Sequence, residues 1–188
     1  MKNLKIFSIL LVAIAFLAMG CNDQQVVDPT DNSVSAPNSG SLSKGKGPVV
    51  ESVTGSGSFT TGAWRTFSFT ARKYADGSVD GEWERINRGS GNAKENKSHG
   101  KVGCLTIVGN EAWIGMVATS GAYSDPGFNE GGVRLIDNGQ GASSPPDKMS
   151  LQRVGQETGF AEWFCAATPE TELYLLEAGN IQIKAGGL

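Results

Sequence analysis

Apolar and polar residues alternate along much of the chain that follows Pro48. In WRTFSFTARKY (64–74), the two phenylalanines and the alanine are separated from one another by polar residues. Alternation with a period of two is typical of a β-strand with one buried face. The segment SVDGEWERI (78–86) has the same pattern, and the Asp76-Gly77 dipeptide before it is a strong hairpin signal. These two segments are therefore predicted to form a β-hairpin.

Six further segments have the length and composition of strands, and turn residues separate several of them. GN at 109–110 is a two-residue hairpin connection, DNG at 137–139 is a second turn, and Gly179 predicts a bend or bulge in the last segment. The segments are KVGCLTIV (101–108), EAWIGMVAT (111–119), GGVRLID (131–137), KMSLQRV (148–154), GFAEWFCA (159–166) and ELYLLEAGNIQIKA (172–185).

The spacing of apolar residues predicts very little helix after the first 20 residues. Nowhere there do ten or more consecutive residues show the spacing of three and four that is typical of an amphipathic helix. We expect about one helical turn, near Pro145 and Pro146 or at 168–172. Short strands and glycine-rich turns predict an all-β domain, a single antiparallel meander of about eight strands. A β-barrel is favoured over a β-sandwich, because closure of a barrel removes exposed strand edges.

The start of the chain has a different pattern. Lys2 and Lys5 precede an uncharged apolar run (6–19). The run is shorter than the roughly 20 residues that cross a bilayer, and it fits a secretory signal peptide. LAMGC (17–21) resembles a bacterial lipobox. The resemblance implies cleavage before Cys21 and acylation of its thiol, so that lipid anchors the mature chain in a membrane. An ordinary cleaved signal peptide followed by a chance cysteine is the alternative.

Composition divides the chain into three parts. We expect a lipoprotein signal peptide at 1–20, the lipidated cysteine and a flexible tether at 21–47, and the all-β domain at 48–188. The tether is rich in Asn, Asp, Ser, Gly and Pro, which do not form a core. Loss of Lys2 and Lys5 with the signal peptide takes the formal net charge from −3 to −5, because the removed segment contains no acidic residue. An acidic surface does not favour binding to nucleic acid.

Two cysteines remain in addition to Cys21. In an oxidising compartment we expect Cys104 and Cys165 to form one disulfide. The bond would close a loop of about 60 residues and stabilise the fold by roughly 4 kcal/mol in the chain-entropy model. Two buried free thiols are the alternative, which the spacing alone does not exclude.

Several short motifs resemble a family of secreted bacterial β-domains. They are GSGSF (55–59), DGSVDGEWE (76–84), HGKVGCLTIVGNEAWIGM (99–116), RLIDNGQG (134–141), PPDKMSL (145–151) and the closing LEAGNIQIK (176–184). The resemblance covers most of residues 50–184 and rests on turn glycines and core positions, which specify a fold rather than an activity. It implies an exported domain with a binding or structural role and no assigned reaction. Glu111 and the charged segment 88–101, which we expect to be a variable loop, depart from the family pattern.

Residues that carry hydrolytic chemistry are few. The one histidine, His99, falls in the charged segment, and no G-x-S-x-G motif supplies a serine nucleophile for it. Asp80, Glu82 and Glu84 share one face of a predicted strand, with neighbours about 7 Å apart, a separation that glycosidases use. Alternating acidic residues are also ordinary on the solvent face of a strand. A carbohydrate-active hydrolase that uses this acidic face is therefore an alternative to a non-enzymatic domain.

Two further candidate sites come from turn and aromatic residues. Asp137, Asn138 and Asp147 flank a glycine-rich turn and carry the oxygen ligands that calcium prefers, so they are a weak calcium candidate, although a plain turn is favoured. No other cofactor is expected. Most of the aromatic residues are expected in the core. Trp113 is the candidate ligand-binding residue, because apolar residues already occupy the other face of its strand.

These features together predict a lipid-anchored domain of the bacterial cell envelope. The outer membrane is favoured, with the domain facing either the periplasm or the cell surface. The membrane is contacted through the N-terminal lipid, and the partner is a protein, a glycan or a small ligand. A non-enzymatic binding or structural module is the favoured function, and the alternatives are a hydrolase and a small-ligand-binding barrel.

Overall fold

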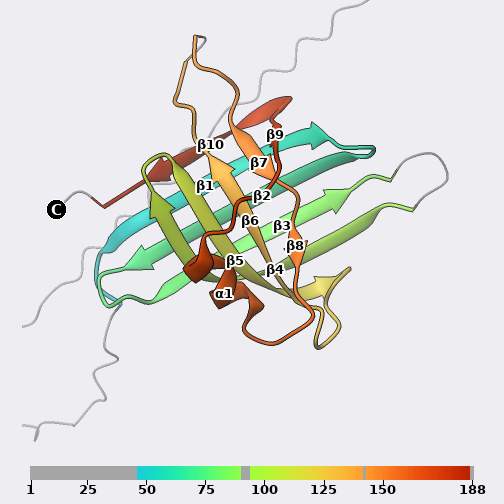
Figure 1. The fold of residues 1–188 in the computed structure, drawn as a ribbon, viewed down its shortest axis with the longest axis horizontal. Helices are drawn as coiled ribbons and strands as arrows, with labels where there is room; N and C mark the ends of the chain where they lie inside the picture. Colours follow the sequence, from blue (N-terminus) through green and yellow to red (C-terminus); the bar gives the residue numbers. More distant parts are fainter. Residues whose placement is uncertain (1–45, 90–93, 142, 187–188) are drawn as a thin grey trace, which may run out of the picture. The chain divides into compact units, whose positions relative to one another are not determined.

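The computed structural model describes residues 46–89, 94–141 and 143–186, which form a curled antiparallel sheet with one short helix on its outer face (Figure 1). The expected signal peptide, Cys21 and most of the expected tether lie outside the described residues. The elements are β1 (Val49–Thr60), β2 (Trp64–Tyr74), β3 (Val79–Asn87), β4 (Asn96–Val108), β5 (Glu111–Gly121), β6 (Glu130–Ile136), β7 (Lys148–Ser150), β8 (Arg153–Val154), α1 (Phe160–Ala167), β9 (Leu173–Leu175) and β10 (Ala178–Lys184).

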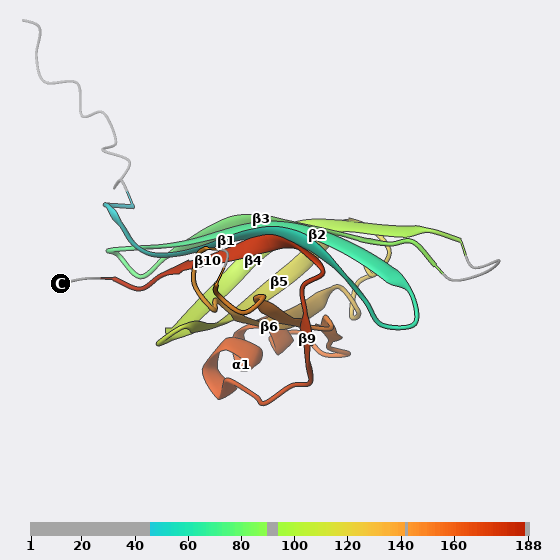
Figure 2. The same cartoon turned by 90° about the horizontal axis from the view of Figure 1, so that it is seen from above.

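The strands lie side by side largely in the order in which they follow one another along the chain. The order in the sheet is β10-β1-β2-β3-β4-β5-β6-β7-β9, and β8 pairs with β6 off this path. Every pairing is antiparallel, and β10 returns to the free edge of β1. Figure 2 shows the sheet arching over its own C-terminal strands, so that it forms a half-barrel. The prediction of an all-β, barrel-like meander is confirmed.

The core lies on the concave side of the sheet and follows the predicted alternation. Phe67 and Phe69 of β2 and Trp83 of β3 are between 4% and 6% exposed. The rings of Phe67 and Phe69 stack with their centres 5.7 Å apart. The predicted hairpin turn is also present, because Gly77 has a φ of +84° and its N–H donates to the carbonyl of Tyr74. Burial of these aromatic rings contributes roughly 2 kcal/mol for each side chain.

The alternation does not predict β1, although it lies inside the sheet between β10 and β2. Its sequence, VVESVTGSGSFT, is rich in Gly, Ser and Thr and offers few apolar side chains. A Cβ atom on Gly55 would lie 2.6 Å from the ring of Phe69. The glycine therefore has a packing role, because it lets an aromatic ring of the neighbouring strand rest on the backbone of β1.

The prediction of a strand at 159–166 is wrong, because most of this segment forms α1. The helix covers the outer face of the sheet and packs against β4, β5 and β6. It ends at Thr168, which has a φ of +44° and precedes Pro169. The helical turns expected near Pro145 and Pro146 and at 168–172 are not present, since both segments are irregular.

Other differences concern strand boundaries and raise the number of strands to ten in the described residues. The segment 148–154 divides into β7 and β8, and the last segment divides at Leu176 and Glu177 rather than at Gly179. β4 begins earlier than predicted, so His99 lies within a strand and not in a loop. Within the described part of the chain, no helix has the length and apolar character needed to cross a membrane.

Candidate functional site

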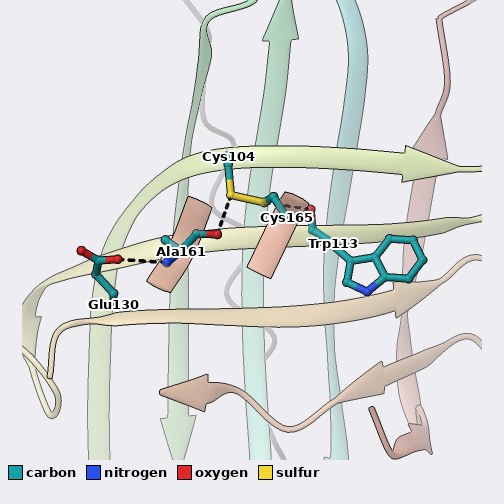
Figure 3. Close-up of a disulfide and its surroundings, with 5 residues drawn as sticks. All are labelled: Cys104, Trp113, Glu130, Ala161 and Cys165. Atoms are coloured by element: carbon teal, nitrogen blue, oxygen red, sulfur yellow. Dashed lines mark hydrogen bonds between the residues drawn. A yellow bond between two sulfur atoms is a disulfide. The ribbon is translucent and has the colours of Figure 1, made fainter. Parts of the chain in front are cut away.

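The predicted disulfide is present and joins α1 to the sheet (Figure 3). Cys104 of β4 and Cys165 of α1 are bonded, with their Cα atoms 6.2 Å apart. The Sγ atom of Cys104 also contacts the carbonyl oxygen of Ala161 at 3.0 Å. Gly115 makes this approach possible, because a Cβ atom there would lie 2.3 Å from that sulfur and 2.4 Å from that oxygen. The absence of a side chain at Gly115 therefore leaves the space on the sheet that α1 occupies.

A carboxylate from the sheet caps the start of α1. Glu130 at the beginning of β6 accepts hydrogen bonds from the backbone N–H groups of Gly159 at 3.0 Å and Ala161 at 2.9 Å (Figure 3). The first N–H groups of a helix have no partner within the helix, and a negative charge there interacts favourably with the helix dipole. Glu130 thus supplies the cap that the local sequence lacks, since no side chain at Gly159 can do so.

Trp113, the candidate ligand-binding residue, is a packing residue. It lies on the outer face of β5 and is 5% exposed, and its indole N–H donates to the carbonyl of Pro169 at 3.1 Å. The guanidinium group of Arg134 lies over the ring, 5.5 Å from its centre, and forms ion pairs with Glu111 and Glu170. The segment after α1 therefore covers the indole, which has no open face for a ligand.

The candidate calcium residues come together, but the carboxylate oxygens of the two aspartates already have partners, and Asn138 donates from its side chain to the carbonyl of Pro146 at 2.6 Å. Asp147 accepts hydrogen bonds from the N–H groups of Asn138 at 2.8 Å and Ile181 at 2.6 Å. Asp137 accepts from the N–H groups of Gly139 at 2.8 Å and Ile183 at 2.9 Å. Each carboxylate oxygen of the two aspartates thus faces a backbone donor. Donors repel a cation, so the arrangement favours the plain-turn interpretation over a calcium site.

The same contacts join the two edges of the curled sheet. Ile181 and Ile183 lie in β10 at one edge, whereas Asp137 and Asp147 lie in the connection between β6 and β7 near the other. We call these two carboxylate–amide contacts the seam. The backbone N–H groups of an unpaired edge need acceptors when they are covered. In the seam, side-chain oxygens take the place of a neighbouring strand.

The acidic face on β3 is paired with lysine side chains. Asp80, Glu82 and Glu84 point to the solvent side of the sheet, as predicted, and each forms an ion pair. The pairs are Asp80 with Lys46 (2.7 Å), Glu84 with Lys97 (2.7 Å), and Glu82 with Lys101. His99 on β4 also faces Glu82, with 4.0 Å between Nε2 and Oε2.

Two of these ion pairs favour the charged form of their carboxyl group, as the pKa shifts of Asp80 and Glu82 show. The hydrogen bond from Lys46 lowers the pKa of Asp80, and the hydrogen bond from Lys101 lowers the pKa of Glu82. A glycosidase needs one carboxyl group that stays protonated near neutral pH, which requires a raised pKa. The electrostatics of Asp80 and Glu82 are therefore opposite to those of a general acid.

The concave side of the sheet contains a pocket that sequence reasoning missed. Aromatic and methionine side chains form its wall, and we call it the interior pocket. The wall residues include Phe59, Phe67, Phe69, Trp83, Met116 and Met149. Its cavity, measured as room for the centre of a water molecule, is about 20 Å³, enough for one water. The half-barrel is therefore mostly filled, with a narrow space left among the aromatic rings.

Polar groups without partners lie along this pocket. Within the described residues, the indole N–H of Trp83, the Nε–H of Arg85 and the side-chain oxygen of Gln152 are buried and have no hydrogen-bond partner. Leaving a buried polar group unpaired costs about 1–3 kcal/mol. All three groups belong to residues that line the interior pocket, which makes it the candidate ligand-binding site.

Two arginines lie at the polar part of the pocket. Arg65 of β2 is half-buried and donates through Nη1 to the carbonyls of Thr61 and Ala63. Arg85 of β3 is half-buried and lies over the ring of Tyr123, 4.9 Å from its centre. Burial and the nearby positive charge of Arg85 lower the pKa of Arg65. Neither arginine forms an ion pair with any residue that the structure describes.

The sequence carries a signal for these arginines. Residues two apart along a strand share a face. Arg65 is therefore on the same face of β2 as Phe67 and Phe69, and Arg85 is on the same face of β3 as Trp83. Charged residues on the buried face of a strand are unusual and deserve a functional explanation.

Comparison of the chain with protein-family models, with curated proteins and with solved structures gives no match. The site is therefore interpreted from its own chemistry.

Proposed function

We propose that this chain is a lipid-anchored module of the bacterial cell envelope whose β-domain binds a small ligand in the interior pocket. The observation that carries the proposal is the set of buried, unpartnered polar groups on Trp83, Arg85 and Gln152, three of the residues that line a cavity with mostly aromatic and methionine walls. Apolar walls with a few placed polar groups are typical of small-molecule sites. The module acts by binding rather than by catalysis.

The anchor rests on the lipobox-like segment LAMGC (17–21) and the signal-like residues before it. Acylation of Cys21 would hold the mature chain on a membrane, and the polar residues up to 47 would separate the lipid from the β-domain. The outer membrane is the favoured location. The resemblance to secreted bacterial β-domains agrees with export, and the disulfide agrees with an oxidising compartment.

The hydrolase alternative has less support. Its acids on β3 are each paired with a lysine, and the pKa values of Asp80 and Glu82 are lowered. Two carboxylates whose pKa values are both lowered do not separate the roles of acid and base. A glycan partner would therefore be bound rather than cleaved.

The anchor is tested by Cys21→Ser in the full chain, expressed in a Gram-negative host and followed by membrane fractionation. We expect the wild-type chain in the detergent phase and the Cys21→Ser chain unprocessed or in the aqueous phase. A variant chain that has lost residues 1–20 and still partitions into the detergent phase like wild type would rule out lipidation at Cys21.

The binding function is tested on the mature chain recovered from membranes. Small molecules that remain bound are extracted and identified by mass spectrometry, in wild type and in Leu151→Trp. Leu151 is half-buried at the pocket, so the larger side chain fills the cavity while the outer sheet is unchanged. We expect a compound in wild type that the variant lacks, with near-ultraviolet circular dichroism showing that both are folded. No bound compound in wild type, or an equal amount in the variant, would contradict the proposal.

A further inference from the structure

We propose, on the basis of the proposed function, that the ligand of the interior pocket carries an anionic group on an apolar chain or ring. The anionic group, a carboxylate or a phosphate, binds between Arg65 and Arg85. The apolar part enters the space between the aromatic rings and the methionines. The inference names the chemistry of the ligand, and it can fail while small-ligand binding remains.

Arg85 has hydrogen-bonding capacity that the described residues leave unused. Its Nε–H is buried without a partner, and its Nη2 reaches the side-chain oxygen of Asn96 only at 3.4 Å. A guanidinium group presents Nε–H and one Nη–H in a fork that matches the two oxygens of a carboxylate or phosphate. The guanidinium group also lies over the ring of Tyr123, with its carbon 4.9 Å from the ring centre. The edge of Arg85 that carries Nε matches an anion with two oxygens, which reaches the buried Nε–H when neighbouring side chains move aside.

Arg65 adds a second positive charge at the same place. Its Nη1 is held by the turn carbonyls of Thr61 and Ala63, which fixes the position of the guanidinium group. Two half-buried cations that lie close together repel one another more strongly than they would in water. A bound anion would relieve this repulsion, so charge complementarity favours an anionic ligand over a neutral one.

The acidic residues nearby have partners of their own. Glu84 borders the pocket, and its carboxylate pairs with Lys97 at 2.7 Å. Glu172 is hydrogen-bonded to the hydroxyl of Tyr174, which raises the pKa of that tyrosine. Neither carboxylate forms an ion pair with Arg65 or Arg85 in the part of the chain that the structure describes. The charge of the arginines is therefore left for a ligand.

The shape of the pocket limits the apolar part of the ligand. The space not filled by atoms, including the open mouth, totals about 440 Å³, yet only about 20 Å³ admits the centre of a water molecule. As it stands the space holds about one water, so a single alkyl chain or a flat ring enters only when side chains of the wall move apart. Met116 and Met149 lie on its wall, and their flexible side chains can move to widen it.

The test uses the mature chain with Cys21→Ser, which changes only a residue outside the described domain. Binding of octanoate, octyl phosphate, 1-octanol and inorganic phosphate is measured by NMR titration, with the indole N–H of Trp83 as the reporter. We expect octanoate or octyl phosphate to shift this signal and to bind at least tenfold more tightly than 1-octanol and inorganic phosphate. The preferred headgroup distinguishes a carboxylate ligand from a phosphate one.

Two variants separate the role of Arg85 from general electrostatics. Arg85→Gln should weaken binding of the anionic amphiphile at least tenfold. Arg88→Gln is the matched control, because Arg88 is exposed near the same end of the sheet, stacks on Trp64 and pairs with Glu95. It should change the affinity less than twofold.

The outcomes distinguish the two proposals. If 1-octanol binds as tightly as octanoate, the anion inference fails while small-ligand binding stands. If inorganic phosphate binds as tightly as octyl phosphate, the apolar part of the inference fails. An equal loss in Arg85→Gln and Arg88→Gln would overturn the role of Arg85. If none of the four probes binds, the inference is overturned, and a compound that still co-purifies with the chain would preserve the proposed function.

Discussion

The two halves of the β-domain are held together in different ways. From β1 to β5 the strands are 9 to 13 residues long, and backbone hydrogen bonds join each to the next. From β6 to β10 the strands are 2 to 7 residues long, and they alternate with loops and α1. β6 and β10 also pair with β5 and β1 over seven positions each, but in this second half side chains make further connections that the first half does not need.

The side-chain connections are few and each has a specific place. Glu130 caps α1, the disulfide ties α1 to β4, and Asp137 and Asp147 hold β10 across the seam. Long ladders spread stability over many similar hydrogen bonds, so a single change removes little. In the second half a single side chain satisfies two backbone groups at once. The second half should therefore be far more sensitive than the first to single substitutions of polar residues.

The largest effect is expected from removing the disulfide. Cys104→Ala combined with Cys165→Ala opens a loop with a sequence separation of 61 residues. The chain-entropy model gives a loss of about 4 kcal/mol in the free energy of unfolding. Urea unfolding measures the loss, and hydrogen exchange should show α1 opening before β1 to β5. A loss below about 1 kcal/mol would mean that other contacts hold the helix in place.

The second effect is expected from Asp147→Asn. Asp147 is 5% exposed, and the amide of the variant would place a donor against one of two backbone N–H groups. We expect a loss of about 2–4 kcal/mol in thermal or urea unfolding. The control is Asp76→Asn, since Asp76 also accepts from a backbone N–H, that of Ser78, but is exposed in a turn. Equal losses in the two variants would contradict the special role of the seam.

A smaller effect is expected at a hairpin of the first half. Gly77 has a φ of +84°, and a Cβ atom there would meet no neighbour within 4 Å, so Gly77→Val costs only backbone strain. The expected loss is about 1–3 kcal/mol. Gly103→Val is the control, because Gly103 lies in β4 without a positive φ and its Cβ would have space. It should leave stability nearly unchanged.

A chelator provides a further comparison with Gly77→Val. Since Asp137 and Asp147 bind backbone donors, removing metal ions should lower the melting temperature of wild type by much less than Gly77→Val does. A chelator effect larger than that of the glycine substitution would give calcium a structural role and return these residues to the candidate metal sites.

The smallest effect is expected on the acidic face. Lys101 lowers the pKa of Glu82, so the contribution of this ion pair to stability is full above the ordinary pKa of a glutamate and is lost progressively as the pH falls through the lowered pKa. Because the pair is exposed, Glu82→Gln should change the melting temperature little at pH 7 and not at all near pH 2. A variant that is clearly less stable at pH 7 would show that exposed pairs also brace the first half.

The sequence predicts the elements of the first half better than those of the second. The alternation predicts β2 and β3, because Phe67, Phe69 and Trp83 point to the core and the residues next to them point to solvent. The disulfide follows from the number of cysteines once Cys21 is assigned to the lipid. Both inferences use information within a short segment or a simple count, which a single sequence contains.

The unpredicted features depend on residues distant in the sequence. α1 has eight residues, and its cap comes from Glu130 while its sheet contact depends on Gly115. The local sequence predicts only a turn at the aspartates of the seam, because their partners in β10 lie more than 30 residues away. The two inward arginines could have been found from the strand face that they share with the aromatic residues. Their convergence on one pocket could not, because it depends on the curl of the sheet.

Side-chain carboxylates close the edge of β10, and the hydrogen-exchange rates of the backbone amides at this edge measure that closure. In wild type, the amides of Ile181 and Ile183 should exchange as slowly as those inside the β1–β2 ladder. In Asp147→Asn, exchange at Ile181 should accelerate at least tenfold more than exchange in that ladder. Fast exchange of both isoleucine amides in wild type, at the rate of an open strand edge, would contradict the claim.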